Sequence, residues 1–214
     1  MKHLYTFVFA VILAFIGNGL HAQSFDGGLV AGPVVSQIDG DGYAGFHQLG
    51  LTAGAFARIP TDGPISWQME LKYSLYGSHS GANEVVQGMN PMNIRLHYIE
   101  VPVLFRYNLS KLNINGFSLD FITVEAGVSA DILLRGTQSA NFEDNFDNGA
   151  WWLFTATGNV GLQFDLNDRL GFNIRSMNSI IPCRLHPEAP VLSFYHYYNI
   201  ALQATVVYTI VHAN

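Results

Sequence analysis

The sequence has few charged residues, one cysteine and almost no long apolar run. Of 214 residues, 10 are Lys or Arg and 16 are Asp or Glu, so charged residues make up 12%, about half the share of an ordinary soluble domain. A net charge of −6 with so few basic groups excludes a nucleic-acid-binding protein, which needs a basic patch to neutralise phosphates. The single cysteine, Cys183, excludes an internal disulfide. Since no base or orienting acid accompanies it, we interpret it as a loop thiol without a role.

The one uninterrupted apolar segment lies at the N-terminus. Lys2 and His3 precede an apolar run from Leu4 to Ile16, and Leu20-His21-Ala22 follows it. A run of 13 residues is too short for a transmembrane helix, which needs about 20, but is typical of a secretory signal peptide. We therefore predict a cleaved signal peptide over residues 1–22 and a single β-barrel domain over residues 23–214.

The mature chain is rich in apolar residues that occupy every second position. From Ile65 to Tyr76 the odd positions are apolar and the even positions are mostly polar. This period of two indicates a strand, because the same residues wound as a helix would leave no apolar face. The alternation recurs and predicts eight strands: Phe25–Ser36, His47–Ile59, Ile65–Tyr76, His97–Tyr107, Ser118–Ile132, Trp152–Phe164, Arg169–Ile180 and Tyr198–Ile210.

The links between these strands alternate between longer and shorter. In chain order they contain 10, 5, 20, 10, 19, 4 and 17 residues. An up-and-down meander with long loops at one end and short turns at the other is the layout of outer-membrane barrels, whose short turns face the periplasm. We predict an all-β fold, an eight-stranded antiparallel up-and-down transmembrane β-barrel. Its termini are expected in the periplasm and its long loops outside the cell.

Alternation alone does not say which face of the barrel points outward. A soluble lipocalin-like ligand-binding barrel shows the same period with its apolar face inside. The polar face of this chain has few charges, however, and aromatic residues mark both ends of the apolar face. The aromatic residues are Trp67, Tyr107, Phe164 and Tyr208 at the short-turn end and Tyr73, Trp152, Phe154 and Tyr198 at the long-loop end. Two aromatic girdles favour the lipid-exposed arrangement, and the lipocalin-like barrel remains the alternative.

The polar face carries five basic and five acidic residues, which we expect to lie in the barrel interior. They are Arg58, Lys72, Arg106, Arg169 and Arg175 with Glu70, Glu100, Glu125, Asp131 and Asp165. Buried ions need counter-charges. The predicted structural charge cluster comprises Arg58, Glu70, Lys72, Glu100, Arg106, Glu125 and Arg175. Symmetric strand pairing about the links places Lys72 opposite Glu100 and Glu125 beside Glu100, with Arg106 or Arg175 neutralising the remainder.

Several short segments resemble the PorT-like outer-membrane β-barrel family of Bacteroidetes-type bacteria. The segments are Gln37–Tyr43, Leu49-Gly50-Leu51, Glu70–Ser74, Tyr98–Pro102 and Glu125-Ala126-Gly127. The resemblance implies an eight-stranded outer-membrane barrel and, in some relatives, a link to protein secretion or surface assembly. One departure is the C-terminus, where such barrels usually end on an aromatic residue and this chain continues six residues past Tyr208.

No segment predicts a cofactor or metal site. Asp39-Gly40-Asp41-Gly42 has the start of a calcium loop, but the twelfth position is Gly50 instead of Glu, so we expect a tight glycine-rich loop. The long loops carry an acidic set that offers an alternative role in recruiting divalent cations: Asp39, Asp41, Glu84, Glu143, Asp144, Asp147 and Glu188. The loop histidines His79, His186 and His196 have no spacing typical of metal ligands.

A lipid-modifying barrel enzyme is the second function class. It would need a nucleophile, a base and an orienting acid at the lipid boundary, and the only such group in the sequence is His97 with Ser78, Ser80 and Glu84. These residues show no motif spacing, so no catalytic residues are predicted.

The leading functional hypothesis is a non-enzymatic outer-membrane barrel, associated with the surface or with secretion and assembly. Eight strands enclose too narrow a lumen for a diffusion porin, which uses about 16 to 18. The protein is therefore expected to act through its extracellular loops and partners. The expected partners are outer-membrane lipid, lipopolysaccharide and other envelope or secretion proteins, and no nucleic acid.

Overall fold

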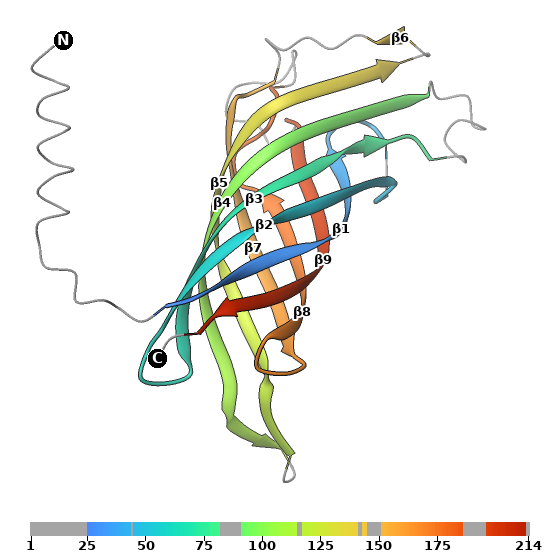
Figure 1. Ribbon diagram of the computed structural model, residues 1–214. Helices are drawn as coiled ribbons and strands as arrows, with labels where there is room; N and C mark the ends of the chain where they lie inside the picture. The colour runs from blue at the N-terminus through green and yellow to red at the C-terminus, as the bar shows by residue number, and fades with distance from the viewer. Residues whose placement is uncertain are drawn as a thin grey trace, which may run out of the picture.

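The fold is built almost entirely from long antiparallel strands (Figure 1). The computed structural model describes residues 25–43, 45–81, 91–114, 117–140, 143–144, 151–185 and 196–212. The long strands are β1 (Asp26–Asp39), β2 (Gln48–Pro60), β3 (Ile65–His79), β4 (Met92–Ile114), β5 (Phe117–Ala140), β7 (Phe154–Asp165), β8 (Leu170–Ser179) and β9 (Tyr198–Val211). A two-residue strand, β6 (Glu143–Asp144), pairs with the end of β5. Among the described residues, no helix is long and apolar enough to cross a membrane.

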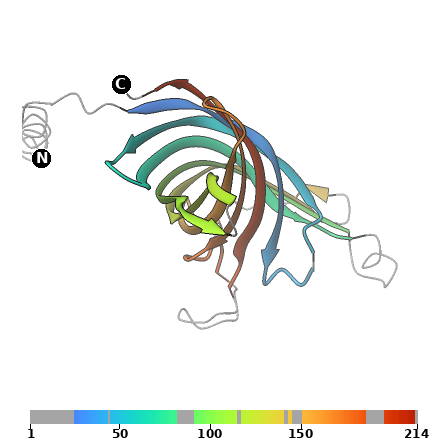
Figure 2. The ribbon, with the colours of Figure 1, turned by 90° about the horizontal axis from the view of Figure 1, so that it is seen from below.

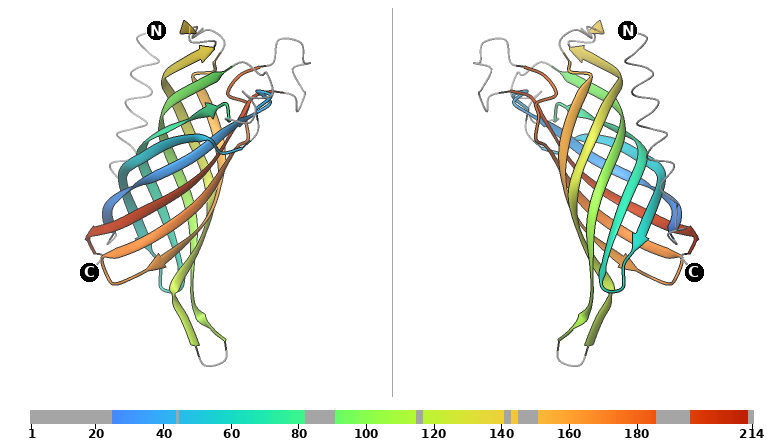
Figure 3. Two further views of the ribbon diagram at one scale, coloured as in Figure 1. Left: turned by 90° about the vertical axis from the view of Figure 1, so that its right-hand side faces the viewer. Right: turned by 90° about the vertical axis from the view of Figure 1, so that its left-hand side faces the viewer.

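Each long strand pairs with its neighbours along the chain, and the first pairs with the last. The order is β4-β3-β2-β1-β9-β8-β7-β5, and the additional β4–β5 pairing closes the ring. Figures 2 and 3 show the strands curving around one axis with a pronounced tilt. In the part of the chain that the structure describes, each long strand therefore has a hydrogen-bonded neighbour on both sides, and the sheet has no free edge strand. The eight-stranded antiparallel barrel predicted from the sequence is confirmed.

Strands β4 and β5 are much longer than predicted and continue past the rest of the barrel. Beyond the pairs Ile65 with Tyr107 and Ile122 with Phe164, β4 and β5 pair only with each other, to Ile114 and Phe117. This two-stranded ribbon projects at the end where the C-terminus lies (Figure 3). The sequence reading of residues 108–117 as a ten-residue link was wrong, because outside the barrel wall strand pairing does not require the apolar alternation that lipid imposes.

The outer wall of the barrel is apolar and the inner wall is not. Outward residues such as Leu71, Val128 and Val160 are 60%, 56% and 62% exposed, whereas most of their inward neighbours along each strand are buried. Trp67 and Phe105 pack edge to face near the short-turn end, with ring centroids 5.4 Å apart. An apolar wall with aromatic residues near its end suits contact with lipid hydrocarbon.

Two layers of side chains with different chemistry fill much of the lumen, and a small apolar cluster of Val30, Phe56 and Val207 lies apart from both. An apolar layer occupies the half toward the long loops and contains Val34, Ile38, Tyr76, Ile94, Leu96, Tyr98, Leu133, Trp151, Met177, Cys183 and Ala201. A charged layer lies further toward the short turns. The apolar layer was not predicted for two reasons. Val34, Tyr76, Tyr98, Met177 and Ala201 occupy positions of polar parity, and the other members lie in segments that were predicted as links between strands.

Candidate functional site

The charged layer of the lumen holds most of the residues that the sequence grouped together. The side chains of Glu70, Lys72, Glu100, Arg106, Glu125 and Arg175 are all buried, with exposed fractions of 0% to 3%. Arg58 lies nearer the short-turn end, and its Nη1 is 3.7 Å from Asp26 Oδ2. Asp131 is buried beside the layer and accepts a hydrogen bond from Ser129. Arg169, which the sequence reading also placed inside, is exposed at a turn, because it precedes the first residue of β8.

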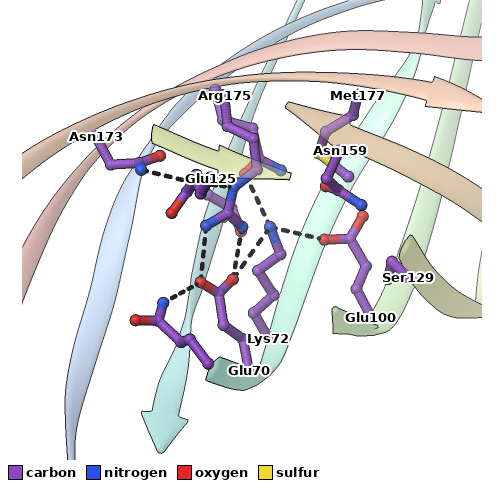
Figure 4. A network of polar contacts seen from close by, with 12 residues as sticks. Glu70, Lys72, Glu100, Glu125, Ser129, Asn159, Asn173, Arg175 and Met177 are labelled. Carbon is purple, nitrogen blue, oxygen red and sulfur yellow. Dashed lines mark hydrogen bonds and ion pairs between the residues drawn. The ribbon is translucent and has the colours of Figure 1, made fainter. Parts of the chain in front are cut away.

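Arg175 forms the densest set of contacts in this layer (Figure 4). Its Nη1 and Nη2 donate to the two carboxylate oxygens of Glu70 at 2.7 and 2.8 Å, and its Nε donates to Glu125 Oε1 at 2.7 Å. The bidentate pair uses the planar geometry that makes arginine–carboxylate contacts strong. One guanidinium group therefore forms ion pairs with two buried carboxylates, one on β3 and one on β5.

Lys72 and Glu100 form the second ion pair. They lie opposite each other in the β3–β4 register, as symmetric pairing about the link predicts. Lys72 Nζ is 3.2 Å from Glu100 Oε2 and 3.7 Å from Glu70 Oε2, and it donates to Gln203 Oε1 at 2.8 Å.

The remaining capacity of the Glu100 carboxylate is taken by hydroxyl groups on β3. Ser74 Oγ donates to it at 2.9 Å, and the Tyr76 hydroxyl donates as well. Both oxygens of Glu100 therefore accept a hydrogen bond, which helps to make a buried carboxylate tolerable.

Glu125 pairs with a different residue from the one expected. It lies opposite Arg106, and Glu100 lies opposite Asp131. The predicted pairing of Glu125 with Glu100 was wrong. It assumed that the chain turns at the centre of residues 108–117, whereas the β4–β5 hairpin turns after Ile114. The Asn115-Gly116 dipeptide, between the paired residues Ile114 and Phe117, is the turn signal that would have given the right register.

These contacts cross the lumen from wall to wall. Glu70 on β3 bonds Arg175 on β8, and these two strands are four positions apart in either direction around the ring. They are diametrically opposite. Lys72 and Tyr76 on β3 also bond Gln203 on β9. The charged layer therefore joins opposite walls of the barrel through hydrogen bonds and ion pairs, and we refer to it as the partition.

A glycine on β7 leaves the space in which this partition forms. Gly161 pairs with Glu125 on one side and with Arg175 on the other, so the two side chains meet above a position that has no side chain. A Cβ added at Gly161 would lie 2.8 Å from Glu125 Oε1 and 2.9 Å from the Ile174 carbonyl oxygen. Sequence reasoning missed this residue, since glycine interrupts an alternating pattern without revealing what lies across from it.

We expect Gly161→Ala to destabilise the folded barrel by about 1 to 3 kcal/mol, the usual effect of overpacking an interior. The added methyl group would push Glu125 away from Arg175. Gly158→Ala on the same strand is the matched control, because its nearest neighbour would lie at 3.8 Å. Urea unfolding in detergent micelles gives both values, and equal midpoints for the two variants would contradict the account.

The long-loop end of the lumen is covered by a short segment that contains the cysteine. Cys183 N donates to the Tyr197 carbonyl at 2.8 Å, and Trp152 N donates to the Cys183 carbonyl at 2.9 Å. The Arg184 guanidinium stacks on the rings of Trp151 and Tyr197, each at 5.4 Å. Cys183 is fully buried and belongs to the apolar layer, so it packs in the interior instead of forming part of a solvent-exposed loop.

Burial raises the pKa of the Cys183 thiol to about 12, because the low-dielectric surroundings disfavour the thiolate. We therefore expect the folded protein to resist maleimide at pH 8 and to react once unfolded in urea. Asp62→Cys in a Cys183→Ala background provides the exposed control. Labelling of the folded wild type as fast as of this control would show that the cover opens.

At the opposite end, the lumen opens into a vestibule of about 440 Å³. Asp26, Arg58, Asp165 and His212 are among the residues that line it.

Among the described residues, no group of three His, Cys, Asp or Glu side chains could hold a metal ion. Glu84, Asp147, His186 and Glu188 of the predicted loop sets, and the predicted signal peptide at residues 1–22, lie outside the described residues, as do the side chains of Glu143 and Asp144.

The residues considered as a lipid-modifying site lie on opposite sides of the barrel wall. Ser78 and Ser80 are buried on the inner side, whereas His97 belongs to the outward set of β4 and bonds the Tyr73 hydroxyl through Nδ1 at 2.5 Å. A base must reach the nucleophile within hydrogen-bond distance, and these residues lie on opposite faces of one sheet.

The closed eight-stranded ring, the apolar exterior and the polar lumen together define an outer-membrane β-barrel protein. The sequence matches the family described as "Outer membrane protein beta-barrel domain" over residues 19–183. The match spans well over half of the chain, and the protein belongs to this family. The family supports localisation in the outer membrane, and the lipocalin-like soluble alternative is therefore wrong.

Solved structures with the same architecture come from other bacterial outer membranes. Ail of Yersinia pestis, in complex with the heparin analogue sucrose octasulfate, has a TM-score of 0.51 at 9% identity, covering 87% of this chain and 99% of Ail. Neisserial surface protein A has a TM-score of 0.48 at 10% identity, covering 87% of this chain and 97% of that one. No curated protein matches the sequence. The likeness to Ail establishes the fold alone.

Proposed function

We propose that this protein is a non-enzymatic outer-membrane barrel of the PorT-like type, which acts by binding partners at the cell surface or in secretion and assembly. The observation that carries the proposal is the wall-to-wall partition, in which Arg175 on β8 bonds Glu70 on β3 across the lumen. A lumen closed in this way does not conduct solutes. The remaining surfaces for function are the loops, the lipid-facing wall and the projecting ribbon.

The proposed orientation places the termini and short turns in the periplasm. It is supported by the expected signal peptide and by the alternation of long and short links, which in outer-membrane barrels puts the short turns inside. Asp62→Cys, in the Cys183→Ala background, tests it directly. A membrane-impermeant maleimide should label this position only after the outer membrane is permeabilised, and labelling of intact cells would contradict the orientation.

The projecting ribbon favours a periplasmic protein partner over a purely surface role. Its strands pair only with each other beyond Tyr107 and Ile122, so their outer edges present backbone groups that another strand can pair with. The ribbon also exposes apolar side chains, with Leu112 and Phe121 47% and 46% exposed. A two-stranded ribbon is only marginally stable by itself, and a docked partner would stabilise it.

Site-specific photo-cross-linking in cells tests this role. A photoreactive residue at Lys111, exposed on the ribbon, should give one reproducible protein adduct. The same residue at Asp62, in the short β2–β3 turn, should give none. Equal adducts at both positions, or none at Lys111, would argue against a ribbon partner, and lipid turnover by the purified protein would favour the lipid-modifying enzyme.

A further inference from the structure

Three cationic or potentially cationic side chains gather on the outer wall at the long-loop end of β4 and β5. Arg95 and His97 are two residues apart on β4, so both point outward, and His97 lies opposite Arg135 of β5. Arg95 lies opposite Thr137, two pairs further along. Both arginine side chains are exposed. We refer to Arg95, His97 and Arg135 as the outer cationic patch.

A β-bulge directs Arg135 into this patch. Tyr98 pairs with Leu133 and His97 with Arg135, so Leu134 is an extra residue in β5. Before the bulge, Asp131 and Leu133 face the lumen, and uninterrupted alternation would also turn Arg135 inward. The bulge turns Leu134 and Arg135 both outward, with Leu134 59% exposed. Bulges often re-aim a side chain at a functional position in this way.

The patch has no counter-charge among the described side chains. Every carboxylate of β3 and β4 is buried in the lumen, as are Glu125 and Asp131 of β5, and Asp120 lies on the ribbon at the far end. Neither Arg95 nor Arg135 forms an ion pair with a described residue. The Tyr73 hydroxyl bonds His97 Nδ1, which leaves Nε2 free to donate to a ligand.

The position of the patch on the wall indicates the ligand. It lies directly beyond the apolar band that includes Leu71 and Val128 and next to Tyr73, an aromatic residue of the expected girdle. This is the level at which hydrocarbon meets headgroups. Two guanidinium groups on paired strands, with an imidazole and a threonine hydroxyl, supply the types of hydrogen-bond donor that bind phosphate.

We propose that the outer cationic patch binds the phosphate of an outer-leaflet lipid headgroup, such as that of a phosphorylated lipid A disaccharide. The inference rests on the proposed orientation, which places the long-loop end in the outer leaflet. Arg95 and Arg135 bind the phosphate oxygens from adjacent strands, and His97, held by Tyr73, contributes a third donor. The bound lipid anchors the β4–β5 wall at a defined depth.

The test measures lipid binding by the full mature chain in detergent, using native mass spectrometry with bisphosphorylated lipid A and with dephosphorylated lipid A as probes. Wild type should retain the phosphorylated form preferentially. Arg95→Gln with Arg135→Gln should weaken that retention about tenfold or more, because two favourable phosphate contacts are lost. Lys111→Gln with Arg169→Gln removes the same charge at the opposite end and should leave retention unchanged.

The site would be overturned if the Arg95/Arg135 variant retained phosphorylated lipid A as well as wild type does. It would also be overturned if the Lys111/Arg169 control lost as much of this lipid as the Arg95/Arg135 variant. Inorganic phosphate binding to wild type as tightly as the lipid would identify a free-phosphate site and also contradict the proposal. Heat-modifiable gel migration reports whether each variant is folded. If the variant fails to fold, the single substitutions Arg95→Gln and Arg135→Gln take its place. Detergent binding does not depend on orientation, so maleimide labelling at Asp62→Cys separates a failure of the orientation from a failure of the patch.

Discussion

Arg175→Met is expected to lower the free energy of unfolding by about 3 to 5 kcal/mol, the usual cost of leaving a buried charge without its partner. The substitution leaves Glu70 with Lys72 at 3.7 Å and Glu125 with Arg106 at 3.7 Å as their nearest cations. Methionine fills much of the volume, so the loss is electrostatic. The urea midpoint of tryptophan fluorescence in detergent micelles, combined with the slope of the transition, gives the value.

Two further variants show whether the loss of stability in Arg175→Met comes from the stranded carboxylates or would follow the removal of any arginine. Arg169→Met makes the same substitution at an exposed turn and should change stability by about 0.5 kcal/mol or less. Adding Glu70→Gln and Glu125→Gln to Arg175→Met removes the stranded charges and should recover part of the loss. A destabilisation of Arg169→Met as large as that of Arg175→Met would contradict the buried network.

Lys72 and Glu100 should show a coupling energy of about 0.5 to 3 kcal/mol in a double-mutant cycle, as expected for groups in one buried network. Glu100→Ala leaves Lys72 with a single carboxylate at 3.7 Å and leaves the hydroxyls of Ser74 and Tyr76 without their acceptor. Lys72→Ala is expected to cost less, since Glu100 keeps both hydroxyl donors.

The combined Lys72→Ala and Glu100→Ala variant should therefore be more stable than the sum of the single effects implies. Urea unfolding of the four proteins under identical conditions provides the cycle. Strictly additive effects would show that the two residues do not interact across the β3–β4 pair.

The fold followed from the sequence because lipid imposes a simple rule on every strand of a barrel. Apolar side chains must face outward throughout the membrane, so the period of two in segments such as Ile65–Tyr76 identified the strands and their parity. The same parity grouped Glu70, Lys72, Glu100, Arg106, Glu125 and Arg175 on the inner face, where the structure finds them.

What the sequence did not reveal depends on register and on contacts across the lumen. The partner of Glu125 depended on where the β4–β5 hairpin turns, and the assumption of a symmetric link placed that turn too early in the chain. Arg135 faces outward only because of a bulge, which alternation does not predict. The Arg175–Glu70 bond joins opposite walls, and no local pattern encodes a distance across a barrel.

The conductance of the purified, folded barrel in a planar lipid bilayer tests most directly whether the lumen is closed and the protein works through its surfaces. Side chains bonded between β3 and β8 cross the lumen, and we expect them to block a continuous water path. The expected record is a flat baseline at neutral pH and ordinary ionic strength, with insertion verified separately by heat-modifiable migration of the reconstituted protein. Stable, reproducible current steps from the folded protein would contradict a closed lumen and would show that the barrel is a channel.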